Sequence, residues 1–333
     1  MKKIKSLFIF SVAFIAVILF FEIFLTLTGI MVPAVKIDAN KGERYFSNKL
    51  CCSIFISEGF GLGKTNNAGW FGKEFIHNDK DLSVAVIGNS FVASRQVFYR
   101  DNFLSVAENT INQKTLNTKV AFYNFGKEAM PLTELLFVKE EIQKDYQPSY
   151  MLVLLNNQSF SNAKRNVPYY KLAGDSLSLD TSFKQSGMVK LYSKIKMVAQ
   201  SSVLFLGYRV KNDFPKTGEI MLDKFCPSSA KSTSEAESDF SFKEVDKTII
   251  EKLVKDKKVI FLLDLDASLS NQIKPLIKES EYLDLRPLLV KMKTEQGIDP
   301  NYWKVANVKG HWNIPAHKMI GEEIANRFYK IIN

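Results

Sequence analysis

The chain of 333 residues is 46% hydrophobic, with a formal net charge of +10 at pH 7 and a pI near 9.2. This length and hydrophobic content argue against disorder of the whole chain and suit one large packed domain. The lysines are scattered, without a basic stripe interleaved with aromatic residues, so nucleic acid is not expected as a partner. The charge suits a solvated surface near acidic glycans or anionic lipid.

The N-terminus carries a long apolar run. Met1-Lys2-Lys3-Ile4-Lys5 precedes a segment from Leu7 to about Pro33 whose only formal charge is Glu22. Such a segment is long enough to cross ~30 Å of hydrocarbon, and it exceeds the roughly 7–15 apolar residues of a cleaved signal. The flanking lysines are expected to remain cytoplasmic. We therefore predict that residues 1–33 form a cytoplasmic stub and a single-pass transmembrane anchor, with the C-terminal domain extracytoplasmic, in the periplasm or at the cell surface.

The cysteines and histidines are too few for a clustered metal centre. The chain has three cysteines, Cys51, Cys52 and Cys226, and three histidines, with no C-x-x-C spacing. We therefore predict neither a metal site nor a cofactor. An oxidising compartment permits disulfides, and a bridge from Cys226 to either of its two possible partners stays open.

Residues 34–80, rich in Gly, Asn and Lys, predict a connector with short irregular elements. Strand and helix patterns then alternate at about 83–88, 101–113, 119–126, 131–145 and 150–157. The strand patterns are continuous apolar runs, which are typical of a parallel sheet covered on both faces. The fold class is therefore α/β, with three layers.

Residues 163–257 are less regular and surround a Ser-rich stretch, with helix patterns near 188–206 and 242–256. A further buried strand pattern follows in "KKVIFLLDLD", and the chain ends in an amphipathic helix that begins near Pro315. We predict an α/β domain over 81–333 with an insertion at about 163–257, which would form a lid or accessory subdomain.

Polar clusters stand where the predicted strands end. They are Gly88-Asn89-Ser90, Asn124-Phe125-Gly126 and Asn156-Asn157-Gln158, and a fourth, Gly310-His311-Trp312-Asn313, precedes the last helix. Ligands of open parallel sheets collect beyond the carboxyl ends of the strands, so these clusters are expected to meet.

The clusters contain what acyl transfer from an ester requires. A serine hydroxyl needs a neighbouring base, and the oxyanion of the tetrahedral intermediate needs fixed donors. We predict Ser90 as nucleophile and His311 as base. The predicted oxyanion hole consists of the backbone N–H groups of Ser90 and Gly126 and the side-chain amide of Asn157. His317 is expected to pack in the final helix rather than react.

The order of these motifs resembles the SGNH, or GDSL-like, hydrolase family, in particular its membrane-anchored extracytoplasmic members. Its four blocks match Gly88-Asn89-Ser90, Gly126, Asn157 and His311, and "NNAGWFGKEF" and "HWNIPAHKMIGEEIA" are similar to its flanking segments. The resemblance covers about residues 65–162 and 258–333. It implies a flavodoxin-like strand order and a serine esterase or O-acyltransferase, with Asn89 and Trp312 near the substrate.

Three acidic residues of the family pattern are replaced. Asn89 and Gln158 stand for two aspartates, and Lys309 or Val308 stands where an aspartate precedes the histidine. Losing the charge that orients the imidazole can cost ~10⁴ in rate. Ser90 and His311 would then act as a dyad, or another carboxylate would substitute. Asp299 is the first candidate, and Asp264 and Asp266 are the others.

Two functions follow from this pattern. The first is an esterase or O-acyltransferase that acts on acyl groups, with acetyl favoured, of a cell-envelope carbohydrate, so that the partners are an acylated glycan and the membrane. The second is a catalytically inactive SGNH-like module that binds glycan or scaffolds a polysaccharide assembly complex in the envelope. The replaced acids favour the second, and the Ser-His pair favours the first.

Overall fold

The fold is seen in a computed structural model, which describes residues 2–28, 35–38, 40–45, 50–55, 58–76, 78, 81–115, 118–161, 167–185, 240–277, 282–304 and 307–332. The predicted helix near 188–206 and the predicted disulfide partner Cys226 lie outside the described residues.

A five-stranded parallel sheet forms the centre of the molecule. Its strands are β5 (Leu82–Gly88), β6 (Val120–Gly126), β7 (Tyr150–Asn156), β10 (Val259–Asp264) and β11 (Tyr282–Asp284). They lie side by side in the order β6-β5-β7-β10-β11. Counted along the chain this is order 2-1-3-4-5, the flavodoxin-like arrangement, so the predicted α/β fold with a parallel sheet is confirmed.

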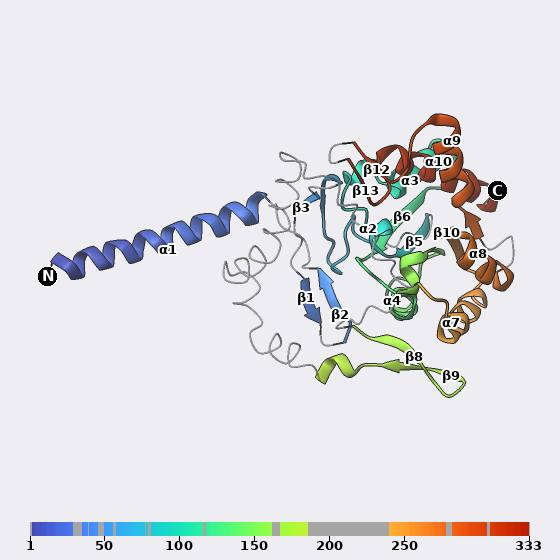
Figure 1. The fold of residues 1–333 in the computed structure, drawn as a ribbon, viewed down its shortest axis with the longest axis horizontal. Coiled ribbons are helices and arrows are strands. Elements are labelled where there is room, and N and C mark those ends of the chain that lie inside the picture. Colours follow the sequence, from blue (N-terminus) through green and yellow to red (C-terminus); the bar gives the residue numbers. More distant parts are fainter. Residues whose placement is uncertain are drawn as a thin grey trace, which may run out of the picture.

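Helices cover both faces of the sheet (Figure 1). On one face lie α3 (Phe103–Asn112), α9 (Arg286–Gln296) and α10 (Ile314–Ile332). On the other lie α4 (Leu132–Tyr146), α7 (Glu244–Val254) and α8 (Ala267–Ile273). Because successive strand side chains point to opposite faces, each strand must be apolar at every position to serve both layers.

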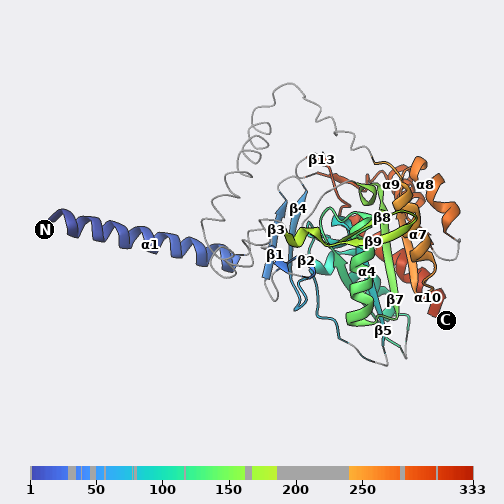
Figure 2. The same ribbon diagram turned by 90° about the horizontal axis from the view of Figure 1, so that it is seen from below.

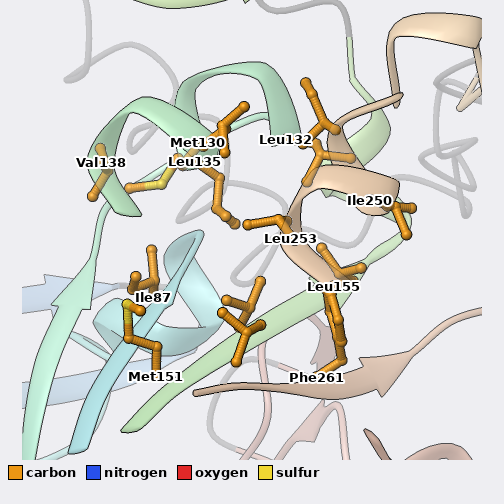
Figure 3. Packing of buried hydrophobic residues seen from close by; sticks show 14 of the residues in the cluster. Ile87, Met130, Leu132, Leu135, Val138, Met151, Leu155, Ile250, Leu253 and Phe261 are labelled. Carbon is orange, nitrogen blue, oxygen red and sulfur yellow. The ribbon is translucent and has the colours of Figure 1, made fainter. Parts of the chain in front are cut away.

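Figure 3 shows one of these layers, where side chains of α4 and α7 meet the sheet. Leu135 of α4 and Leu253 of α7 lie over Ile87 and Met151, and all four are at most 1% exposed. The opposite layer packs around Trp312, which is fully buried. These two cores fix the strand ends from which the polar clusters project.

The region predicted as an irregular connector forms two antiparallel hairpins. These pair β1 (Val35–Asp38) with β2 (Gly42–Tyr45), and β3 (Leu50–Phe55) with β4 (Gly59–Lys64). Glycines alternate along β4, and a Cβ added at Gly61 would lie 2.0 Å from the carbonyl oxygen of Arg95. Glycine therefore lets this strand lie directly against the backbone that follows Ser90.

The region predicted as an insertion contains part of the main fold. A hairpin of β8 (Tyr169–Ala173) and β9 (Ser176–Asp180) packs beside α4, as Figure 2 shows. The helix predicted near 242–256 is α7, which belongs to the layer formed with α4. The sequence around 242–257 is thus a crossover helix of the α/β domain rather than part of an insertion.

The remaining described elements are short, apart from the N-terminal helix. They are α1 (Lys2–Thr28), α2 (Ser90–Ala93), β12 (Tyr302–Trp303) and β13 (Val308–Lys309), with 3-10 turns at Tyr99–Asp101, Asn157–Phe160, Ser182–Gln185 and Lys274–Leu276. Both views show α1 extending away from the α/β domain (Figures 1 and 2). Over the described residues, no helix meets the length and hydropathy required of a membrane span.

His317 is fully buried and, as predicted, packs on the buried face of the final helix, α10. Its ring stacks on Phe103 at 5.8 Å, and its Nδ1 accepts the backbone N–H of Phe103 at 3.3 Å. Burial lowers the pKa of His317 from 6.5 to about 3, because the charged ring would lose its water. The ring therefore stays neutral in the folded protein at ordinary pH.

This burial predicts an acid-sensitive stability. Between about pH 6.5 and pH 3 the unfolded chain binds a proton at His317 that the folded chain rejects. The free energy of unfolding should then fall by about 1.4 kcal/mol for each unit by which the pH is lowered within this window. Urea unfolding of the wild type and His317→Gln at pH 7.5, 6.0 and 5.0 measures the effect. His317→Gln should be less stable but lack this component of the pH slope, and equal slopes in the two proteins would contradict the prediction.

Candidate active site

The turn after β5 presents Ser90 at the edge of the sheet. Asn89 closes the turn, since its Oδ1 accepts the backbone N–H of Phe91 at 3.2 Å. Gly88 is required where the chain turns, because an added Cβ would lie 2.6 Å from a side-chain carbon of Val92. Ser90 itself is only partly buried. Its hydroxyl thus stands at the carboxyl end of a buried strand without being enclosed in the core.

The structure brings Ser90 and His311 into hydrogen-bonding contact and adds a carboxylate that the sequence did not indicate. His311 Nε2 lies 2.7 Å from Ser90 Oγ, and His311 Nδ1 lies 2.6 Å from Glu58 Oε2. A carboxylate only accepts, so Nδ1 donates to Glu58 and Nε2 is left to accept the Ser90 hydroxyl. Glu58, His311 and Ser90 therefore form a continuous relay of acid, imidazole and hydroxyl.

Glu58 reaches His311 because the β3–β4 hairpin packs against the backbone after Ser90. Glu58 stands in the turn just before β4, whose Gly59 and Gly61 approach the carbonyls of Gln96 and Arg95. At the other end, a Cβ on Gly310 would lie 2.4 Å from Glu58 Oε1. Only a residue without a Cβ at position 310 leaves room for this carboxylate.

The loop that carries His311 is fixed by side-chain amides. The Asn301 Nδ2 group donates to the carbonyl of Gly310 at 2.9 Å, and the Gly310 N–H donates to the carbonyl of Asn301 at 2.9 Å. The His311 ring packs on Phe91 at 4.8 Å, and the His311 N–H donates to Glu58 Oε2 at 3.2 Å. The imidazole is thus held on both edges before any substrate binds.

The prediction that Asp299 orients His311 is wrong. Asp299 instead accepts the backbone N–H of Asn301 at 3.1 Å and pairs with Lys293 at 3.3 Å. The two other candidates face elsewhere: Asp264 contacts Arg286 and Trp312, and Asp266 caps α8. Burial raises the pKa of Asp264, although Arg286 opposes this shift. The residues near His311 in the sequence could not indicate Glu58, because Glu58 lies 253 positions earlier in the chain.

Two of the three predicted oxyanion donors already have partners within the protein. The N–H of Gly126 donates to the side-chain oxygen of Asn124 at 2.8 Å. Asn157 Nδ2 donates to Asp266 Oδ2 at 2.7 Å, and Asn157 Oδ1 accepts the Asp266 N–H at 3.1 Å. The Ser90 N–H makes no hydrogen bond to any of the residues that the structure describes. Among the three predicted donors it is therefore the one without a partner in the described part of the chain.

Asn156 was not predicted as a site residue, whereas its neighbour Asn157 was. The structure places Asn156 next to the turn that carries Ser90. Its Oδ1 accepts Asn89 Nδ2 at 2.6 Å, while its own Nδ2 has only a 3.5 Å contact with Asn89 Oδ1. Since Ile87 pairs with Val153 near the end of both strands, Asn156 at the end of β7 lies beside the turn that follows β5. Two successive asparagines at a strand end gave no means of deciding between them.

Asn89 and Trp312, predicted to lie near the substrate, are both enclosed by protein. Asn89 is 1% exposed and is used in the turn and in the pair with Asn156. Trp312 is fully buried against Phe91 and Phe103, and its Nε1 donates to Asp264. Both side chains therefore pack beneath the surface of the site and are not exposed to a ligand.

A cavity of about 580 Å³ opens beside the relay. Its lining comprises Glu58, Phe91, Gln158, Arg286, Leu289, Val290, Lys293, Asp299, Pro300, Asn301, Lys309, Gly310 and His311. The imidazole and its carboxylate thus form part of the wall of a space that can hold a ligand. The described part of the chain contains no group of three or more His, Cys, Asp or Glu side chains able to hold a metal ion.

Comparisons with known proteins give weak similarities. No family model matches the chain, and no curated protein matches it. Among solved structures, a lipase/acylhydrolase from Enterococcus faecalis is 11% identical over 75% of this chain and 96% of its own, with a TM-score of 0.37. A catalytic mutant of an acetylxylan esterase from Geobacillus stearothermophilus is 10% identical over 78% of this chain and 97% of its own, with a TM-score of 0.37. A member of the lipolytic G-D-S-L family from Veillonella parvula is 9% identical over 75% of this chain and 97% of its own, with a TM-score of 0.34. Similarities this low assign no activity.

The relay predicts that Ser90 reacts with a fluorophosphonate and that Glu58 governs the rate. Attack by Ser90 Oγ on phosphorus expels fluoride and leaves one adduct, which mass spectrometry of peptides locates. Glu58→Gln removes the charge beside Nδ1 and should slow labelling by about 10²–10⁴. Asp299→Asn, the matched control, should label within about twofold of wild type. Equal rates for Glu58→Gln and wild type, or a comparable loss in Asp299→Asn, would show that Glu58 is not the orienting acid.

Proposed function

We propose that this protein is a serine ester hydrolase or O-acyltransferase of the SGNH type, with Ser90 as nucleophile, His311 as general acid and base, and Glu58 as the orienting carboxylate. The observation that carries the proposal is the unbroken relay from Glu58 Oε2 through the imidazole to Ser90 Oγ. A hydroxyl at 2.7 Å from a ring nitrogen is within reach for direct proton transfer.

In acylation, Ser90 Oγ attacks the ester carbonyl as His311 Nε2 takes the hydroxyl proton. The imidazolium then faces Glu58, whose charge stabilises it. Collapse of the tetrahedral intermediate breaks the bond to the alcohol, and His311 returns its proton to the leaving oxygen. Water or a sugar hydroxyl then attacks the acyl-Ser90 ester with the same base, which gives hydrolysis or transfer.

The negative oxygen of the intermediate would be held by the Ser90 N–H and by the side-chain amide of Asn156. The Ser90 N–H has no partner among the described residues, and Asn156 Nδ2 is engaged only at 3.5 Å. This assignment replaces Gly126, whose N–H donates to Asn124, and Asn157, whose amide is held by Asp266 through both Nδ2 and Oδ1. One such donor typically contributes about 2.7–4 kcal/mol to the transition state.

Acyl groups of cell-envelope carbohydrate, with acetyl favoured, are the proposed substrates. Supporting this are the resemblance of the motif order to SGNH hydrolases and the apolar run that would place the domain outside the cell. Hydrolysis and transfer share the acyl-enzyme and differ only in the acceptor, so one site serves either reaction.

Hydrolysis of 4-nitrophenyl acetate tests the reaction. Wild type should release nitrophenolate above background and Ser90→Ala should not. Asn156→Ala should lose about 10²–10³ in kcat, whereas Asn157→Ala, a matched truncation one residue away, should keep most of it. Thermal unfolding checks that each variant is folded. Background rates in wild type together with no fluorophosphonate adduct would contradict the proposal and favour a module that binds glycan without chemistry.

We further propose that the N-terminal segment anchors the domain to the outer side of a membrane. The run from Leu7 to Pro33 supports this, as does the exposure of Phe8, Phe14 and Phe20 on α1 at 69%, 59% and 64%. Full-length protein should sediment with membranes and resist a carbonate wash, whereas the chain lacking residues 1–33 should be soluble. Protease added to intact spheroplasts should cut the C-terminal domain. Release of the full chain by carbonate would contradict anchoring, and protection from the protease would contradict the orientation.

A further inference from the structure

The cavity beside His311 has an unusual mixture of walls. Phe91, Leu289 and Val290 provide apolar surface, and Val290 is half exposed. Glu58 and His311 form the wall nearest the relay. Between them lie several charged side chains that the proposed reaction does not use. A cavity that combines apolar and charged walls selects ligands by charge as well as by shape.

Three cations line this space, but two of them are balanced. Arg286 of α9 lies 3.3 Å from a carboxylate oxygen of Asp264, and Lys293, two turns later, lies 3.3 Å from Asp299. Glu58, the remaining acid, is hydrogen-bonded to His311. The charges of Arg286 and Lys293 are therefore offset within the protein.

Lys309 is the cation left over. It lines the cavity and is exposed, and its side chain forms no hydrogen bond or ion pair with any residue that the structure describes. Its backbone is nonetheless held in place, since Lys309 pairs with Tyr302 across the β12–β13 ladder. The next residue, Gly310, is hydrogen-bonded to Asn301 through both its N–H and its carbonyl. One ammonium group without an ion-pair partner among the described residues is thus carried by a fixed strand two residues from the catalytic imidazole.

We propose that Lys309 binds a carboxylate of the substrate, so that the preferred esters belong to carboxylated molecules such as acylated acidic sugars. This inference rests on the proposed function. A carboxylate matches the single charge of this ammonium group, whereas a phosphate monoester carries about −1.5 to −2 near pH 7. Binding here adds a charge-assisted contact that a neutral ester lacks and increases the local concentration of anionic substrate.

Two pairs of esters, each with one carboxylated and one neutral member, test this inference. The first pair is 4-nitrophenyl hydrogen succinate and its methyl ester, with the charge in the acyl part. The second is 3-carboxy-4-nitrophenyl acetate and 4-nitrophenyl acetate, with the charge in the alcohol part. In at least one pair, kcat/KM of the full-length protein should favour the charged ester about tenfold. The preference should shrink as salt rises from 50 to 500 mM.

Lys309→Gln should abolish most of this preference while leaving turnover of the neutral esters within about twofold. Lys330→Gln, at the exposed end of α10, removes the same charge away from the cavity and should leave the preference intact. This control separates recognition by Lys309 from attraction by the net charge of +10. An unchanged preference in Lys309→Gln, or no preference in either pair, would overturn the inference.

Binding to Ser90→Ala separates this inference from the proposed reaction. Calorimetry with the same four esters measures affinity in a protein that cannot form the acyl-enzyme. Tighter binding of a charged ester to Ser90→Ala supports the carboxylate site if the double variant with Lys309→Gln no longer shows this difference in affinity. This holds even if the wild type hydrolyses none of the esters. Equal affinities for charged and neutral esters contradict the carboxylate site even if hydrolysis by Ser90 is fast.

Discussion

The site depends on two places where a glycine allows a close approach that a Cβ would obstruct. Along β4, Gly59 and Gly61 let the hairpin lie against the carbonyls of Gln96 and Arg95. At Gly310, the missing Cβ leaves the space that the Glu58 carboxylate occupies. Side chains at these positions would hold the hairpin away from the sheet edge or push the carboxylate from the imidazole. The relay is therefore a product of these close approaches as much as of its three side chains.

The sheet provides the other half of the geometry. In the order 2-1-3-4-5, the chain leaves β5 in one direction and returns to β7 on the other side, so a crevice opens between these strand ends. Ser90 follows β5, and Asn156 ends the neighbouring strand β7. His311 enters from the loop before α10; Asn301 holds the preceding residue, Gly310, and the His311 ring packs on Phe91. Each group thus comes from a different element, and the two buried cores keep these elements in register.

Much of the fold was predictable from the sequence, because buried parallel strands and amphipathic helices leave strong periodic patterns. The meeting of Ser90 and His311 followed from strand-end chemistry. Glu58 did not, since it belongs to a hairpin outside the sheet and its partner is remote in sequence. The alternating glycines after it were the available signal, as glycine within a strand often marks a close approach. Asn156 was not predicted, because the sequence does not show that Asp266 holds the amide of the neighbouring Asn157.

The position of the carboxylate affects how distant homologues are sorted. Glu58 sits on a hairpin that adds no strand to the central sheet, so the acid and the histidine belong to separate parts of the fold. The lack of an acid just upstream of the histidine therefore does not exclude a relay of acid, imidazole and hydroxyl. An acidic residue followed by glycine at every second position, well before the serine turn, is the pattern to look for. A domain boundary drawn at the first strand of the sheet would discard it.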